Sequence, residues 1–254
     1  MLKYDAFQLK WIAIIGMILN HVVIAWWEII PVWLAVPFYA AGGLTFPIMA
    51  FFVVEGYRHT SNLKRYILRL LIFGTISIPF HVMTFGHIGL NIMFTIILGI
   101  LCILLYDKIK IRPLFWLLFI IIASLTAFPI FFDWAIIGVI VILLTHIIKN
   151  EKKRRVIPSV VAGIFMFGVA WMMILGETSP YFEADIMGMP GYDLTLMYVS
   201  AVFIVGCIAA AILLLNFNGE RGKRMKWLFY SFYPLHLAVL GIVAVVMGWV
   251  VLPF

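Results

Sequence analysis

Three polar residues in the first apolar run, Lys10, Asn20 and His21, have the types and spacing that chemistry inside a membrane requires. On an α-helix that rises ~1.5 Å per residue, Lys10 and His21 lie roughly 16 Å apart along the axis and nearly on the same face. Polar groups in lipid usually face a bundle interior or a wet cavity, because burying them in hydrocarbon is costly. The pattern favours a membrane-embedded reaction site, with an interfacial cation at one level and an imidazole deeper in.

The composition is that of an integral membrane protein. Of the 254 residues, 65% are hydrophobic and 11% are charged, whereas soluble domains average ~45–50% and ~25%. No stretch suggests a separate soluble domain, so residues 1–254 are predicted to form one membrane domain. The first apolar run is too long for a cleavable signal peptide. Cys102 and Cys207 both fall within apolar runs, and no structural disulfide is expected.

Apolar runs long enough to cross a bilayer predict an all-α, polytopic transmembrane helix bundle of about nine spans. The spans are placed near residues 8–30, 37–56, 66–85, 89–106, 113–128, 133–148, 156–175, 194–216 and 227–250. Alternate connections, residues 1–10, 57–69, 107–112, 149–155 and 217–226, contain all 18 lysines and arginines. Because positive residues mark the cytoplasmic side, the N-terminus is predicted to be cytoplasmic and the C-terminus outside. The net charge of +7 is therefore assigned to topology and not to nucleic acid.

The basic segments allow two interpretations. The clusters at residues 149–155 and 220–226 are best explained by topology and contact with anionic lipid headgroups. In the segment after the second span, Arg65 and Arg69 are four residues apart and share a helix face. Together with Arg58 and Lys64 they could bind the phosphates of a ligand, because guanidinium groups bind phosphate bidentately. Topology alone explains this segment equally well.

Few other polar residues lie within or beside the spans. Glu55 and Arg58 are three residues apart and can form an ion pair. His81 and Asp133 are placed near the outer ends of their spans, where water is expected to reach them. A lone His236 in the last span is more often an interhelical hydrogen-bonding residue than a catalyst.

Several familiar sites are missing from the sequence. It contains no Gly-rich phosphate loop, no His-Glu-x-x-His, no Cys-x-x-Cys and no Gly-x-Ser-x-Gly motif. No metal site is expected. Mid-span carboxylates and internal repeats, which are typical of transporters, are also lacking. The interpretation that remains is a reaction at a histidine, with a basic entrance to the site on the cytoplasmic side.

The chain resembles the TraX family, named for a pilin-acetylating membrane protein, and more distantly the multi-span acyltransferase-3 clan. The resemblance runs through residues 9–21, 45–60, 64–71, 78–80, 91–95, 133–139 and 232–236. The spacing from Lys10 to His21 also resembles the clan's motif of a basic residue, ten residues and a histidine. No single piece is specific, but the set in this order is.

The resemblance implies acyl transfer from cytoplasmic acetyl-CoA to an acceptor reached within or outside a bacterial cytoplasmic (inner) membrane. In the clan, the histidine that matches His21 is catalytic, and basic residues corresponding to Lys10 and the segment 58–69 would hold the CoA phosphates. Two departures matter: Asn20 stands where the family often has Asp before the histidine, and His81 follows residues 78–80 where Asp is frequent. An amide can orient a neighbouring imidazole but cannot stabilise an imidazolium as a carboxylate does.

His21 would act as a general base toward an amine or hydroxyl, or carry the acetyl group transiently, and direct base catalysis is slightly preferred. Tyr233 and His236, with Glu55 and Asn91, are candidate cavity-lining or substrate-binding residues. Asp133 is a candidate receptor for a cationic acceptor at the outer mouth.

The acceptor class stays open: a peptide, a glycan and a small molecule are all compatible. The acidic outer segment 177–193 could screen basic acceptors, but a solvated connection is the simpler interpretation. The competing hypothesis is a non-catalytic multi-span protein, either a transporter or a peptide-binding immunity factor, whose function would survive the loss of His21.

Overall fold

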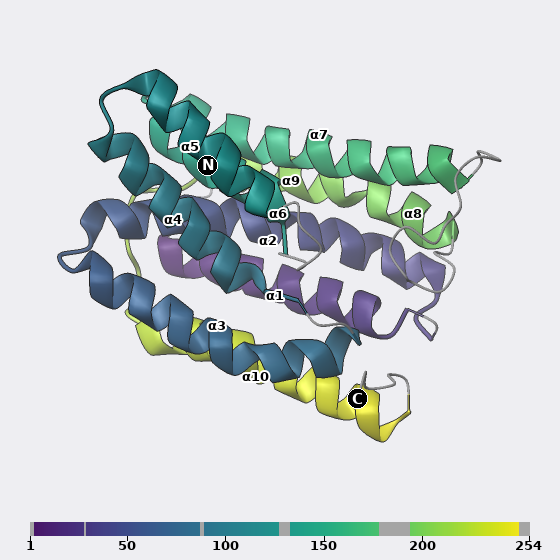
Figure 1. Ribbon diagram of the computed structural model, residues 1–254. Coiled ribbons are helices and arrows are strands. Elements are labelled where there is room, and N and C mark those ends of the chain that lie inside the picture. The colour runs from purple at the N-terminus through teal and green to yellow at the C-terminus, as the bar shows by residue number, and fades with distance from the viewer. Residues whose placement is uncertain (1–2, 28, 87–88, 127–132, 178–193, 249–254) are drawn as a thin grey trace.

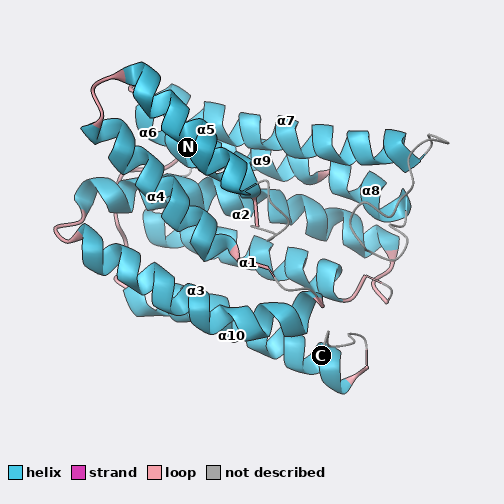
Figure 2. Cartoon of the chain, viewed as in Figure 1, coloured by secondary structure: helices cyan, strands magenta, loops and turns pink. Residues whose placement is uncertain are grey.

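Helices account for nearly all of the computed structural model, which describes residues 3–27, 29–86, 89–126, 133–177 and 194–248 (Figure 1). Within these ranges it has ten helices and no β-strand, and Tyr4 and Phe217 form an isolated β-bridge (Figure 2). The helices are α1 (Ala6–Ala25), α2 (Val32–His59), α3 (Leu63–Phe85), α4 (Ile92–Lys108), α5 (Arg112–Thr126), α6 (Ala135–Ile147), α7 (Glu151–Glu177), α8 (Leu194–Ala201), α9 (Phe203–Leu215) and α10 (Lys226–Val246).

The nine predicted apolar runs all correspond to helices, so the all-α prediction is confirmed for the described residues. The eighth run is divided near Val202 into α8 and α9. Six candidate spans within the described residues are long and apolar enough to cross a membrane, and they come from α1, α2, α3, α7, α8–α9 and α10. Helices α4, α5 and α6 are shorter, with 17, 15 and 13 residues. The acidic segment 177–193, apart from the backbone of Glu177, lies outside the described residues.

Side chains that satisfy free backbone groups set several helix ends. Asp5 accepts a hydrogen bond from the Gln8 backbone N–H, and the Gln8 side chain accepts one from the Asp5 N–H, which together form a capping box at the start of α1. Asn62 caps α3 by accepting from Arg65 N–H, and Asn91 caps α4 by accepting from Met93 N–H.

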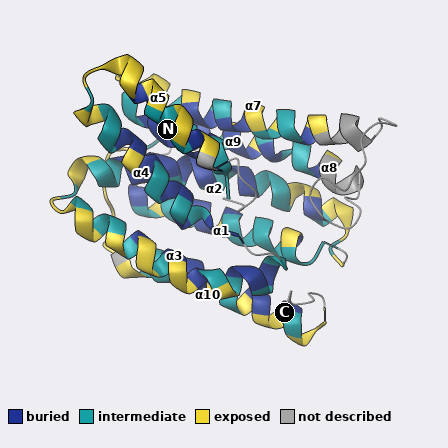
Figure 3. Cartoon of the chain, viewed as in Figure 1, coloured by how far each residue is buried: buried dark blue, intermediate teal, exposed yellow. Residues whose placement is uncertain are grey.

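Helix α2 lies in the middle of the bundle, with α1 and α9 packed against it, while α3 pairs with α10 and α7 with α9 (Figure 1). Glycine permits the closest approach: a Cβ at Gly206 in α9 would overlap the carbonyl oxygen of Ala40 in α2. Exposed residues lie along the outward faces of the helices (Figure 3). They include apolar side chains such as those of Leu68, Leu117 and Val239. An apolar exterior is what a lipid-facing bundle requires.

The described residues of the five basic segments lie at one end of the bundle, as the charge distribution predicts, and the Tyr57 hydroxyl donates to Asp107 between two of these segments (Figure 1). The Asn218 backbone N–H donates to the Tyr4 carbonyl oxygen, which joins the first segment to the last. Arg155 donates to the Phe217 carbonyl oxygen. Arg58 donates to the carbonyl oxygen of His146. We call the end of the bundle that contains these basic segments the basic end.

Candidate functional site

A cavity of about 300 Å³ lies between α1, α2, α3, α4 and α10, the first residue of α9 and the two residues before α6. Most of its lining is apolar. Its polar lining residues are Asn20 and His21 from α1, Thr45 from α2, His81 from α3, Asp133 just before α6, and Tyr233 from α10. We call it the central cavity. A mostly apolar cavity with a few convergent polar groups is the usual form of a small-molecule site.

His21 is hydrogen bonded across the bundle to His236. The distance from His21 Nδ1 to His236 Nε2 is 2.9 Å, although the two residues are 215 positions apart in the chain. The Phe85 ring lies edge-on to the His21 ring, with centroids 5.3 Å apart. The catalytic candidate therefore has a fixed partner from the last helix, and it lines the central cavity.

Asp133 is held in place by the backbone and by neighbouring side chains. Its carboxylate accepts a hydrogen bond of 3.2 Å from the Ile92 backbone N–H, and its carbonyl oxygen accepts one from the Thr95 hydroxyl. The next residue, Trp134, has a φ of 62°, a conformation that costs ~1–3 kcal/mol for a residue other than glycine. Backbone strain of this kind often accompanies functional sites.

His81 corrects one expectation. Water was expected to reach it, but its side chain is 1% exposed, and its Nε2 lies 3.5 Å from the Asp133 carboxylate. Both residues line the cavity. His81 therefore belongs to the interior of the site.

Two cavity-lining polar groups are buried without a hydrogen-bond partner of ordinary geometry among the described residues. They are the Asn20 side-chain Nδ2 and the Tyr233 hydroxyl. Tyr233 is 3% exposed. Buried polar groups in folded proteins are nearly always paired, so these two are available to a ligand.

Lys10 lies toward the basic end from His21, along α1. Its ammonium packs against the Phe52 and Phe229 rings, 5.0 and 5.3 Å from their centroids, and Phe229 lines the central cavity. No ion pair involves Lys10 within the described residues. The predicted cation, Lys10, therefore contacts a side chain, Phe229, that lines the same cavity as the predicted imidazole, His21.

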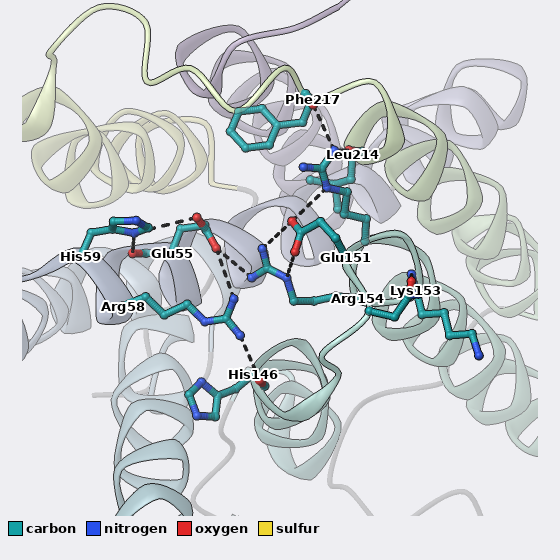
Figure 4. A network of polar contacts seen from close by, with 11 residues as sticks. Glu55, Arg58, His59, His146, Glu151, Lys153, Arg154, Leu214 and Phe217 are labelled. Atoms are coloured by element: carbon teal, nitrogen blue, oxygen red, sulfur yellow. Dashed lines mark hydrogen bonds and ion pairs between the residues drawn. The ribbon is translucent and has the colours of Figure 1, made fainter.

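The four cations predicted to bind phosphate together lie at separate places in the structure. Arg58 lies 3.8 Å from Glu55 and donates to the His146 carbonyl oxygen, as Figure 4 shows. Lys64 and Arg65 are exposed on α3. The Arg69 guanidinium lies over the Tyr230 ring of α10, at 5.5 Å. The structure does not gather these four residues into one pocket.

Topology and contact with lipid headgroups were the predicted roles of Arg154 and Arg155, and the structure corrects the lipid contact of Arg154, which is buried. Arg154 is 4% exposed and donates to Glu55 at 2.7 Å and to Glu151 at 2.7 Å (Figure 4). Arg155 donates to the Leu214 and Phe217 carbonyl oxygens. We call Glu55, Arg58, Glu151, Arg154 and Arg155 the basic-end cluster. The spacing of Glu151 and Arg154, three residues apart, was the sequence signal for a local pair.

Two predicted lining residues lie elsewhere. Glu55 belongs to the basic-end cluster. Asn91 is buried and donates to the Gly74 carbonyl oxygen, so it joins α4 to α3. Conversely, Thr45 lines the cavity without having been singled out. Its hydroxyl donates to the Ala13 carbonyl oxygen and so ties α2 to α1.

The fold and the site define an integral membrane protein, a helix bundle whose mostly apolar internal cavity contains a few polar groups. The chain belongs to the TraX protein family, whose model matches residues 6–244. It is 29% identical over 253 residues to the probable fimbrial assembly protein FimC, serogroup H1, of Dichelobacter nodosus, and the match covers 94% of this chain and 95% of that one. No solved structure matches the chain.

Proposed function

We propose that the protein is a membrane-embedded acyltransferase that moves an acetyl group from acetyl-CoA to an amine or hydroxyl acceptor, with His21 as the reacting base. The observation that carries the proposal is the connection along α1: Lys10 packs on a ring that lines the cavity into which His21 faces. A phosphate-binding cation and a base are thereby linked through one apolar space. The Lys10 to His21 spacing also supports kinship with the acyltransferase-3 clan.

The central cavity is suited to the thioester end of acetyl-CoA and not to the whole molecule. About 300 Å³ is at the lower limit of small-ligand sites. The lining is mostly apolar, as a thin pantetheine arm requires. The charged nucleotide would stay at the basic end, where Lys10 and the α3 cations Lys64, Arg65 and Arg69 are the candidate phosphate contacts.

The acceptor side of the cavity is assigned to Asp133, Asn20 and Tyr233. The Asp133 carboxylate favours a cationic or hydrogen-donating group, and among the described residues the Tyr233 hydroxyl and the Asn20 Nδ2 have no hydrogen-bond partner of ordinary geometry. These features support an amine or hydroxyl. The Dichelobacter relative is named for fimbrial assembly, which favours a peptide acceptor, while glycan and small-molecule acceptors stay compatible.

His21 would move a single proton during the reaction. It accepts the proton from the acceptor N–H or O–H while the acceptor bonds to the thioester carbon, and returns it to sulfur as the C–S bond breaks. CoA leaves as the thiol, and the imidazole is neutral again. General base catalysis of this kind contributes about 10²–10⁴-fold. A transient acetyl-histidine is the alternative, and direct transfer is slightly preferred.

The proposal includes a location and an orientation. The basic end would face the cytoplasm of a bacterium, with the protein in the inner membrane, because all 18 lysines and arginines lie in the segments assigned to that end. Nine crossings, including the shorter α4, α5 and α6, would leave the C-terminus outside.

The test is acetyl-CoA binding and turnover on detergent-purified protein, comparing wild type with His21→Ala. We expect both proteins to bind acetyl-CoA and only the wild type to release free CoA. If neither binds at millimolar concentrations, the acyltransferase proposal fails. A non-catalytic transporter or peptide-binding immunity protein then takes its place.

A further inference from the structure

His236 has both ring nitrogens engaged. Its Nδ1 lies 3.0 Å from the carbonyl oxygen of Phe232, one helical turn earlier in α10. Its Nε2 lies 2.9 Å from His21 Nδ1. A carbonyl oxygen can only accept a hydrogen bond, so His236 Nδ1 must carry a proton and donate it.

This contact determines the protons of both histidines. His236 is 8% exposed, and a charge buried in a membrane bundle is costly, so the neutral ring is favoured. A neutral imidazole with a proton on Nδ1 has a bare Nε2, which must accept from His21 Nδ1–H. A neutral His21 with its proton on Nδ1 in turn has a bare Nε2. The nitrogen left to act as a base is therefore His21 Nε2.

The His236 ring is itself held firmly. It stacks on the Phe232 ring, with centroids 5.0 Å apart and planes 6° from parallel, and the Tyr233 ring lies edge-on to it. One residue further along α10, the Leu237 carbonyl oxygen lies 2.9 Å from the Thr84 hydroxyl of α3, which donates to it. Local stacking and helix pairing thus fix the position of the acceptor nitrogen.

We propose that His236 is the positioning residue of the site: it fixes the tautomer and orientation of His21 and aims His21 Nε2 at the reacting groups. This inference rests on the proposed acyl transfer for its catalytic meaning. In a hydrolase triad a carboxylate holds the base histidine; here a neutral imidazole accepts the same hydrogen bond. When His21 takes up a proton, that bond becomes charge-assisted and stronger. His236 thereby supplies the hydrogen-bond acceptor that the amide of Asn20 does not provide to His21 within the described structure.

The first experiment is nitrogen NMR of protein labelled in its histidine rings, with the His21 signals identified by their absence in His21→Gln. In the wild type we expect His21 to be protonated on Nδ1 and bare on Nε2. His236→Gln keeps an acceptor oxygen near the same point and should preserve this pattern. His236→Phe fills the space without an acceptor, so the His21 tautomer should change. A wild-type His21 protonated on Nε2, or a pattern unchanged in His236→Phe, would overturn the inference.

The second experiment measures turnover. Relative to the wild type, His236→Phe should lower kcat about 10- to 100-fold with the KM for acetyl-CoA nearly unchanged, and His236→Gln should recover part of that loss. His59→Phe, at an exposed histidine of the basic end, is the matched control and should match the wild type. Equal kcat values for His236→Phe and the wild type would remove His236 from the mechanism. If the wild type does not turn over acetyl-CoA, the acyltransferase proposal fails, while the tautomer measurement still decides the role of His236 toward His21.

Discussion

The central cavity and the basic-end cluster both contain polar side chains that lie between helices. The two regions differ in whether those side chains have hydrogen-bond partners within the protein. In the basic-end cluster, Arg154 donates to two carboxylates at 2.7 Å, and Arg155 donates to two carbonyl oxygens. In the central cavity, the Asn20 amide nitrogen and the Tyr233 hydroxyl have no partner of ordinary geometry among the described residues. Fully paired polar groups hold helices together. Polar groups that face a cavity without a partner are available to a ligand. The comparison therefore assigns the basic-end cluster to the stability of the bundle and the central cavity to its function.

Breaking the basic-end cluster should have the largest effect on stability. Arg154→Met removes the buried guanidinium that donates to both Glu55 and Glu151, which are 25% and 52% exposed. Because the two glutamates can partly rehydrate, we expect a loss of about 2–3 kcal/mol instead of the larger cost of a fully buried pair. Thermal unfolding in detergent should show a clear fall in Tm, with turnover per folded molecule retained.

The matched control for that change is Lys153→Met, which replaces the exposed neighbouring residue (Figure 4). It should leave Tm within a degree or two of the wild type. Equal Tm values for Arg154→Met and Lys153→Met would mean that the cluster does not stabilise the bundle.

On the cavity side, Lys10→Met should weaken acetyl-CoA binding about tenfold, which corresponds to ~1.4 kcal/mol. Methionine keeps the packing on the Phe52 and Phe229 rings and removes the charge, so Tm should hardly change. Equilibrium binding at two salt concentrations measures the effect, and the affinity of the wild type should fall more steeply with salt. Lys64→Met removes one of the candidate phosphate contacts on α3, but Lys64 is exposed and its charge is screened by salt, so the loss of affinity should be smaller than for Lys10→Met. A larger loss for Lys64→Met than for Lys10→Met would place the main phosphate contact on α3.

Two tyrosine hydroxyls provide the finest comparison of the two regions. The Tyr57 hydroxyl donates to Asp107 at 2.8 Å near the basic end, whereas the Tyr233 hydroxyl has no hydrogen bond of ordinary geometry among the described residues. Tyr57→Phe should therefore cost ~1 kcal/mol of stability, and Tyr233→Phe should cost less. Thermal unfolding of the two variants side by side checks this. A loss of stability in Tyr233→Phe equal to that in Tyr57→Phe would show that the Tyr233 hydroxyl is paired within the protein.

Much of the fold could be predicted from local patterns. Apolar runs predicted the helices because a membrane requires long apolar segments whose backbone groups are satisfied internally. The placement of lysines and arginines predicted which connections lie together, and contacts such as Arg58 to His146 and Arg155 to Phe217 agree with it. The division of the eighth run into α8 and α9 had no local signal in that pattern.

The site was harder to predict because its contacts are long-range. Lys10 and His21 share one helix, so their spacing was readable. The pairing of His21 with His236 depends on how α10 packs beside α1, and nothing in either local segment indicates it. His81 was expected to meet water because it lies near a helix end, yet the packing around Phe85 buries it. Arg154 looked like a lipid-facing cation in a basic run until the fold brought Glu55 to it.

The most direct test of the central claim follows the acetyl group itself. Membrane vesicles that contain wild type, His21→Ala or His59→Ala would be supplied with radiolabelled acetyl-CoA on the face of the basic end. We predict that the wild type and His59→Ala transfer the label to a product other than CoA, and that His21→Ala does not. Equal labelling in His21→Ala, or wild-type labelling no higher than in empty vesicles, would contradict the account.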